Sequence, residues 1–318
     1  MPRVSVIIPV YNSSALIGRT LKSVMAQAGD FEIIVVDDCS TDDTVAIVER
    51  LNEPRIKVYR QSRNMGPAAA RNCGLATASG EYCAFLDGDD FWELDFLKET
   101  VGFLDTHPDA VAVSVMQCHK IIGKEPSIVP AKTNVSEPVL LDDFFDFWRK
   151  YNHVCTGSVL FRTEIARRSG GQREDLRICE DLEFWAMLAL QGKWGFIPNV
   201  LFTSDGGEVT RKQGWLEKNM IRWNNAPSFP EWRMRIDAQV SQLKTTSMER
   251  ALGRIARNLC YCHIMSRKDT LARQEVREFG KLFPKNKINA IFRYMALSAA
   301  SWKIWCSFLR CREMHRAV

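Results

Sequence analysis

The sequence lacks the features of several common classes of protein. Its ten cysteines include no C-x-x-C pair and follow no regular spacing, so no disulfide framework is predicted. The N-terminal segment MPRVSVIIPVYN has no basic leader, no long apolar core and no small-residue cleavage site, which argues against secretion. No internal repeat or low-complexity tract is present. These absences indicate a globular, cytoplasmic protein with reduced thiols, and its 318 residues suffice for one or two domains.

Strand-like apolar runs alternate with helical patterns over the first 115 or so residues. The runs are VSVIIPV, EIIVVDD, RIKVY and EYCAFLD, and the helical patterns span residues 16–25, 45–51, 67–78 and 96–104. Near-continuous apolar strands separated by helices are typical of a parallel sheet covered on both faces. Ligands of such sheets bind at the carboxyl ends of the strands. We therefore expect an α/β domain with its site at that edge.

The rest of the chain is predicted to change in character. Residues 119–140 are interpreted as a connecting loop, followed by a strand at TGSVLFR, a turn at Gly170 and Gly171, and a helix opening at ICEDLEFWAML. From about residue 214 the patterns are helical, with breaks expected near Pro227, Pro230 and Pro284. Residues 1–205 carry a net charge of −8, whereas residues 206–318 hold 22 Lys and Arg against 9 Asp and Glu, a net charge of +13. Such a split predicts a catalytic part and a part that meets anionic surfaces.

The first strand is not followed by a familiar nucleotide fingerprint. Neither G-x-G-x-x-G nor G-x-x-x-x-G-K-[ST] occurs there, which disfavours hydride transfer and P-loop chemistry. The strand ends carry carboxylates instead. FLDGDD places Asp87, Asp89 and Asp90 after a buried strand, where their charges repel unless a cation or donor network compensates them. A divalent metal between carboxylate and diphosphate would do so, although an isolated D-x-D is more often a polar turn that caps the next helix.

Two further motifs follow neighbouring strands. VVDDCSTDDT ends the second strand with Asp37 and Asp38, which are positioned to accept hydrogen bonds from a base or ribose. RQSRNMGPAAARN follows the third strand and begins a helix whose amides, with Arg63 and Arg71, could neutralise an anion. Arg71, one turn inside the helix, is equally suited to pair with a strand-end aspartate.

The ordered motifs VSVIIPVYN, VVDDCSTDDT, NMGPAAARN, FLDGDD and ICED resemble glycosyltransferase family 2 over roughly residues 3–200. The resemblance implies the GT-A fold, a Rossmann-like nucleotide-diphospho-sugar transferase domain. It predicts a GT-A domain at 1–205, with a nucleotide-binding half at 1–115 and an acceptor-side half at 116–205, and a basic helical region at 206–318. It also assigns site residues. The donor-binding set is Pro9, Tyr11, Asn12, Asp38, Asn64, Gly66, Arg71 and Asp87, with Asp89 as metal ligand and Asp181 as catalytic base.

The same resemblance implies a metal-dependent, inverting hexosyl- or hexosaminyltransferase. Inversion needs one base opposite the leaving group, so Asp181 would take the proton of the acceptor hydroxyl. A metal on Asp89, Mn²⁺ or Mg²⁺, would stabilise charge on the departing nucleoside diphosphate. Asp181 also fits a helix N-terminal charge that interacts with the macrodipole, as Glu180 and Glu183 do.

The implied role is the synthesis of bacterial cell-surface polysaccharide, whether O-antigen, capsule or exopolysaccharide. The expected partners are a nucleotide-sugar donor, by default a UDP-sugar, and a glycan or polyprenyl-diphosphate-linked acceptor. A catalytically inactive GT-A scaffold and a sugar nucleotidyltransferase are the alternatives. Intact Asp87, Asp89 and Asp181 argue against the first, and PVYNSSALIG lacks the Gly-rich basic loop of the second. No nucleic-acid module is recognised, so no nucleic-acid partner is expected.

The C-terminal pattern KINAIFRYMALSAASWKIWCSFLRCR has apolar residues at spacings of three and four, punctuated by Lys and Arg. Its uncharged interval between Arg293 and Lys303 is too short for the roughly 20 apolar residues that span a bilayer. Two interpretations remain. Residues 287–318 lie at the inner face of the cell membrane with basic residues on anionic headgroups, or they form an ordinary amphipathic helix packed on the protein.

Overall fold

The structure is a computed structural model, which describes residues 1–120, 125–130, 132–205, 215–240 and 245–317. The chain divides into two compact units. Unit 1 comprises residues 1–174 and 180–209, and unit 2 comprises residues 175–179 and 210–318.

Unit 1 is built from alternating strands and helices. Its elements are β1 (Val4–Val10), α1 (Ile17–Met25), β2 (Phe31–Asp37), α2 (Thr44–Arg50), β3 (Ile56–Arg60), α3 (Pro67–Thr77), β4 (Tyr82–Phe85), β5 (Phe91–Trp92), α4 (Phe96–Thr106), β6 (Ala110–His119), β7 (Ser127–Val129), β8 (Val139–Leu141), α5 (Phe144–Tyr151), β9 (Val159–Arg162), α6 (Thr163–Arg168), α7 (Glu180–Ala189) and β10 (Lys193–Ser204). The four predicted strands and four predicted helices of the first 115 residues all form, with bounds shifted by at most two residues.

These strands form one mixed sheet in the order β3-β2-β1-β4-β9-β6-β10-β5, with β7 beside β6 and β8 beside β10. Strands β1 to β4 pair in parallel, as predicted, with β1 between β2 and β4. Strand β9 runs antiparallel to both β4 and β6, so the parallel pairing of β1 to β4 does not continue beyond β4. The predicted α/β class is confirmed.

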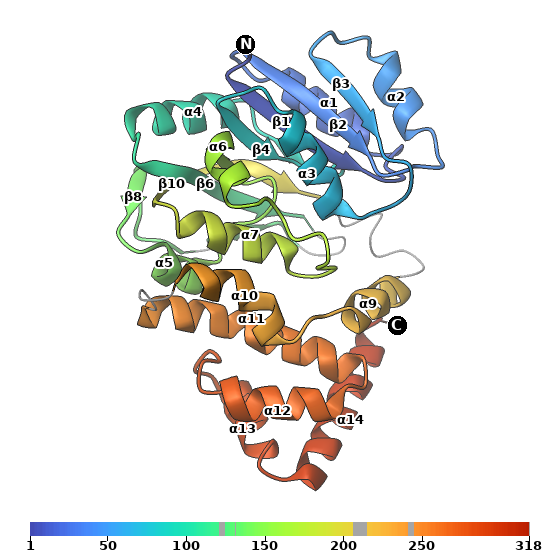
Figure 1. The fold of residues 1–318 in the computed structure, drawn as a ribbon, viewed down its shortest axis with the longest axis vertical. Coiled ribbons are helices and arrows are strands. Elements are labelled where there is room, and N and C mark those ends of the chain that lie inside the picture. Colours follow the sequence, from blue (N-terminus) through green and yellow to red (C-terminus); the bar gives the residue numbers. More distant parts are fainter. Residues whose placement is uncertain (121–124, 131, 206–214, 241–244, 318) are drawn as a thin grey trace. The chain divides into compact units, whose positions relative to one another are not determined.

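Both faces of β1 are covered. Val6 and Ile8 join one core cluster with Leu21 of α1 and Val48 of α2. Successive residues of a strand point to opposite faces, so Ile7 faces the other side, where helix α3 lies. That approach is close, because a Cβ added at Gly74 of α3 would lie 2.3 Å from the Ile7 Cγ2 atom. In Figure 1, α3, α6 and α7 lie in front of the sheet.

The interpretation of residues 119–140 as a connecting loop is wrong in part. The described part of this segment contains β7 and the start of β8, which pair with β6 and β10. Each of these strands has only three residues, and most of them are exposed or partly exposed. Such short strands form because a neighbouring strand offers hydrogen bonds, and they leave almost no periodicity in the sequence.

Unit 2 is helical in its described residues, as predicted. Its helices are α9 (Trp215–Asn224), α10 (Phe229–Gln239), α11 (Thr246–Met265), α12 (Asp269–Phe279), α13 (Lys287–Met295) and α14 (Ala299–Ala317). The breaks expected near Pro227 and Pro230 coincide with the interval between α9 and α10, and the one near Pro284 with the interval between α12 and α13. Pro230 lies in the first turn of α10, where its missing N–H costs nothing, and Ser228 and Glu231 close a capping box around it.

Residues 287–312, which read as one pattern, form two helices. Arg273 of α12 donates hydrogen bonds to the carbonyls of Ala296 and Leu297, where α13 ends (2.9 and 3.2 Å). Phe292, Trp302 and Leu309 of the predicted apolar stripe are buried within unit 2. Much of the stripe is therefore protein core. None of the helices, within the ranges given above, is long and apolar enough to cross a membrane.

Candidate active site

The polar motifs follow strands whose carboxyl ends meet at one edge of the sheet. Strand β1 runs parallel to β2 and to β4, which brings the segments after these strands together. Two backbone hydrogen bonds extend this alignment beyond the strands. The Asp38 N–H donates to the Val10 carbonyl (2.8 Å), and the Leu86 N–H donates to the Ile7 carbonyl (3.0 Å).

Asp38 organises the loop before helix α3. Its two carboxylate oxygens accept hydrogen bonds from the Met65 and Gly66 amides, at 2.7 and 2.8 Å. Gly66 has φ +92°, in the region that favours glycine, and it caps α3. The Asp38 side chain is buried, whereas Asn64, on the loop before α3, is exposed. Donor binding by these residues stays a prediction; the structure adds that Asp38 holds the loop in place.

The segment after β1 is shaped by a similar side-chain contact. Asn12 has φ +49°, and its side-chain oxygen accepts a hydrogen bond from the Thr41 amide (2.8 Å). This contact joins the loops after β1 and β2. Tyr11 is 50% exposed, so its ring is open to a ligand, while Pro9 is buried inside β1.

The FLDGDD loop carries more negative charge than its surroundings compensate. Burial, followed by repulsion from Asp87, raises the pKa of Asp89. Burial, followed by the charges of Asp87 and Asp89, raises the pKa of Asp90 to about 8. Carboxylates in this state favour a bound cation, and their oxygens are the donors that Mg²⁺ and Mn²⁺ prefer. Within the described ranges, no group of three or more His, Cys, Asp or Glu side chains is arranged to hold a metal ion.

Helix α1 supports this loop from behind, which sequence reasoning missed. The buried Thr20 hydroxyl donates to the carbonyls of Gly88 (3.0 Å) and Asp90 (2.7 Å). This hydroxyl of α1 therefore helps to hold the backbone that carries the loop carboxylates. A threonine within an amphipathic helix gives no signal of such a role, because only the fold places it under the loop.

Arg19 of α1 makes a second unpredicted contact with the loop. Its guanidinium donates to the Asp89 carbonyl (2.6 Å), pairs with the Asp205 carboxylate and lies 5.0 Å from the centre of the Phe91 ring. Residues 205 and 19 are far apart in the sequence, so no local pattern indicates this pair.

Arg71 connects the loop to helix α7. Its Nη2 atom lies 2.6 Å from the Asp87 Oδ1 atom, and its Nη1 atom lies 3.9 Å from the Glu180 Oε1 atom. The Gln172 side-chain oxygen accepts a further hydrogen bond from it (3.2 Å). The Arg71 side chain is only 5% exposed. Of its two predicted roles, pairing with a strand-end aspartate is the one that these contacts show.

Asp181 lies in the first turn of α7, next to Glu180. Burial is the largest cause that raises the pKa of Asp181, to about 6, and the Glu180 charge adds to it, while Arg71 lowers it. A carboxylate with this pKa is ionised at neutral pH and is a better proton acceptor than an ordinary aspartate. The structure thus gathers Asp87 and the Glu180–Asp181 pair around one guanidinium.

Comparison with known proteins gives the class of this site. The chain matches Glycosyl transferase family 2 over residues 5–168 and belongs to that family. The crystal structure of S. aureus TarS 1-349 in complex with UDP-GlcNAc is similar in fold, with a TM-score of 0.66 and 21% sequence identity, covering 99% of this chain and 91% of that chain. The fold is therefore GT-A with a helical C-terminal region.

Two curated relatives are glycosyltransferases whose names give a polysaccharide or a substrate. TuaG of Bacillus subtilis (strain 168), named for teichuronic acid biosynthesis, is 44% identical over 194 residues, which are 60% of this chain and 73% of TuaG. WfaP of Escherichia coli, a UDP-Glc:alpha-D-GlcNAc-diphosphoundecaprenol beta-1,3-glucosyltransferase, is 40% identical over 107 residues, 33% of this chain and 43% of WfaP. Matches to other relatives span still smaller shares, 36% of ExoO and 21% of TarS. The chain thus spans less than half of the length of several relatives.

Proposed function

We propose that the protein transfers a sugar from a nucleotide diphosphate donor to an acceptor hydroxyl with inversion, in bacterial surface-polysaccharide synthesis. The observation that carries the proposal is the Arg71 contact with both Asp87 and Glu180. It joins the carboxylate loop after β4 to a helix that presents Asp181, a carboxylate of raised pKa. Inverting transfer needs both parts, a donor diphosphate site and one base facing it.

The proposed roles follow from this arrangement. Asp181 accepts the proton of the attacking hydroxyl, while Arg71 keeps its pKa from rising further. Tyr11 is exposed for contact with the base of the donor, and Asp38 and Asn12 fix the loops around it.

A divalent metal, Mn²⁺ or Mg²⁺, fits the uncompensated charge of the FLDGDD loop. Asp89 would hold it, with Asp87 on the ribose side. When bound, such an ion stabilises negative charge on the departing diphosphate.

The relatives support a uridine donor and a lipid-linked acceptor. The name of WfaP gives a UDP-Glc donor and a diphosphoundecaprenol acceptor, and TarS is solved with UDP-GlcNAc. We extend both to this chain as a UDP-sugar donor and a glycan or polyprenyl-diphosphate-linked acceptor. Such an acceptor places the protein at the inner face of the cell membrane. Residues 287–318 are the proposed contact with anionic lipid, since Ile288 and Ile291 are exposed.

The test is release of nucleoside diphosphate from a panel of nucleotide sugars, with Mn²⁺ or chelator, in the presence of a bacterial lipid extract. We expect metal-dependent release from one donor. Asp181→Asn should keep donor binding and lower transfer at least about 100-fold, because the base is lost. Asp95→Asn, at an exposed position of unit 1, is the control. Equal transfer by wild type and Asp181→Asn would refute the assignment of the base.

A further inference from the structure

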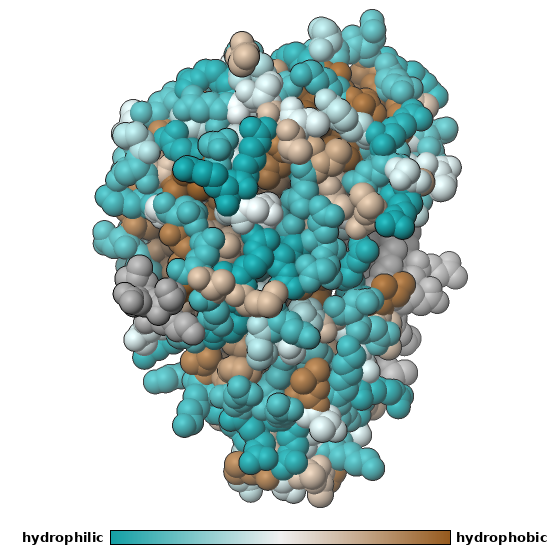
Figure 2. Space-filling view, in the orientation of Figure 1, coloured by the Kyte–Doolittle hydropathy of each residue, from teal (hydrophilic) through white to brown (hydrophobic). Residues whose placement is uncertain are grey.

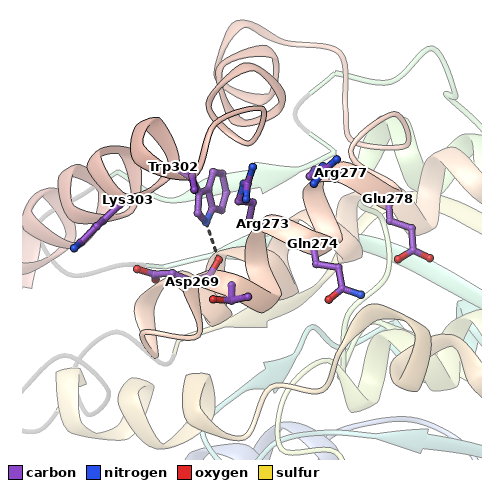
Figure 3. A pocket seen from close by; sticks show the side chains of 9 residues that line it. Asp269, Arg273, Gln274, Arg277, Glu278, Trp302 and Lys303 are labelled. Carbon is purple, nitrogen blue, oxygen red and sulfur yellow. Dashed lines mark hydrogen bonds between the residues drawn. The ribbon is translucent and has the colours of Figure 1, made fainter.

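A pocket of about 700 Å³ lies within unit 2, between α12 and α14 (Figure 3). Three of its nine lining residues are cations: Arg273 and Arg277 of α12, and Lys303 of α14. Figure 3 shows Arg273 beside Trp302 and Arg277 on the same side of α12, while Glu278 points away from them. The pocket therefore combines a concave shape with an excess of positive charge.

The ion pairs among the described residues do not cancel the positive charge of the pocket. Asp269, which also lines the pocket, is already paired with Arg310 at 2.6 Å. Arg273 donates to backbone carbonyls, which orient its guanidinium without neutralising it. Among the residues that the structure describes, no ion pair engages Arg277 or Lys303. An anion that entered this pocket would thus meet two cations, Arg277 and Lys303, that make no ion pair among the described residues, with Glu278 also among the lining residues.

Trp302 gives the pocket a fixed wall. Its side chain is 2% exposed, and its indole N–H donates to the Asp269 carbonyl at the start of α12 (2.7 Å). That hydrogen bond joins α14 to the start of α12 at one side of the pocket.

Exposed apolar residues are frequent in the stretch of sequence that contributes Ala299, Trp302 and Lys303 to this pocket. Of the thirteen large hydrophobic residues that are exposed among the described ones, six fall within residues 288–308. They are Ile288, Ile291, Tyr294, Leu297, Ile304 and Phe308. Figure 2 shows hydrophobic residues among hydrophilic ones on the surface of this part of unit 2.

One hydrogen bond and one step along the chain link the apolar residues to the pocket. Arg273 is hydrogen-bonded to the carbonyl of Leu297, whose side chain is 72% exposed. Lys303 directly precedes Ile304, which is 68% exposed. Cations beside exposed apolar side chains match a lipid surface, where phosphates lie directly above acyl chains. A soluble anion would give no reason for the apolar rim.

We propose that the pocket between α12 and α14 binds the phosphate headgroup of an anionic phospholipid, with Leu297 and Ile304 entering the acyl region. The inference rests on the proposed membrane contact of residues 287–318 and narrows it to one site. It also extends that contact to α12, which lies outside the predicted membrane segment.

The experiment measures binding of the full chain to phosphatidylcholine vesicles with and without phosphatidylglycerol, by co-sedimentation. The pocket variant is Arg277→Gln with Lys303→Gln, since both side chains are exposed and make no ion pair among the described residues. Each basic residue near an anionic membrane contributes about fivefold to binding, so the variant should bind phosphatidylglycerol vesicles roughly 30-fold more weakly. The matched control, Lys22→Gln with Arg50→Gln, removes the same charge from exposed positions of unit 1 and should stay within about twofold of wild type.

The outcomes separate this inference from the broader ones. Equal binding by wild type and the pocket variant overturns the headgroup site, even where wild type needs phosphatidylglycerol. Stabilisation of wild type by inorganic phosphate, lost in the variant without loss of vesicle binding, identifies a free anion and also overturns it. Absence of all vesicle binding by wild type overturns the membrane contact itself. Donor hydrolysis in the absence of vesicles reports on glycosyl transfer alone and should be unchanged in the pocket variant.

Discussion

Replacement of Arg71 by methionine tests whether one buried cation sets the properties of the site. The variant leaves the carboxylates of Asp87, Glu180 and Asp181 without their shared partner. An opposite charge within about 4–6 Å shifts a carboxylate pKa by roughly 1–3 units, so removal of Arg71 should raise the pKa of Asp181 by about one unit or more. Loss of one partner of a buried ion pair costs about 3 kcal/mol of unfolding free energy.

The assay is the pH dependence of kcat/KM together with urea unfolding. Asp181 acts as a base only when ionised, and its pKa in wild type is about 6, so activity should fall as the pH drops through that value. In Arg71→Met the fall should occur at least about one pH unit higher. Arg71→Lys keeps the charge but loses the planar fork, so its acid limb should stay near that of wild type.

The control is Arg233→Met in unit 2. Arg233 is also buried and paired, with its Nη2 atom 2.6 Å from the Glu249 Oε1 atom. This variant should lose comparable stability while its pH profile stays unchanged. An acid limb that does not move in a folded Arg71→Met protein would refute the link between Arg71 and the base.

Two further predictions concern the loop support and the core. Thr20→Val removes the hydroxyl that donates to the loop carbonyls, so donor KM should rise about tenfold. Thr100→Val loses only hydrogen bonds within α4 and should leave donor KM unchanged. An unchanged donor KM in Thr20→Val would show that the FLDGDD loop keeps its conformation without the Thr20 hydroxyl. Burial tends to raise the pKa of Glu32, but hydrogen bonds from Lys57 and neighbouring hydroxyls lower it to about 2. This folded pKa is below that of the unfolded chain, so about 2 kcal/mol of stability should be present above pH 5 and lost as pH falls toward 2, in wild type but not in Glu32→Gln. The same loss of unfolding free energy between pH 5 and pH 2 in wild type and Glu32→Gln would contradict this prediction.

Local sequence patterns were sufficient to locate the strands and helices that have a regular apolar periodicity. The apolar runs of β1, β2 and β4 are buried on both faces, and their apolar periods together with the turn residues located these strands to within two residues. The order of the motifs also indicated the family. By contrast, β7 and β8 exist only because β6 and β10 offer them hydrogen bonds.

By itself the sequence determined the class of fold, the strand-end positions of the acidic motifs and the basic character of residues 206–318. These properties depend on residues that are close together in the chain, so apolar periodicity and charge in the sequence indicate them directly. The tertiary structure decided which side chains meet. It paired Arg71 with Asp87 instead of leaving it free for a phosphate, placed Thr20 and Arg19 beneath the carboxylate loop, and turned much of the C-terminal stripe inward around Trp302. Such contacts join residues 16 to 186 positions apart, and only the folded chain fixes the distances on which their electrostatics depend.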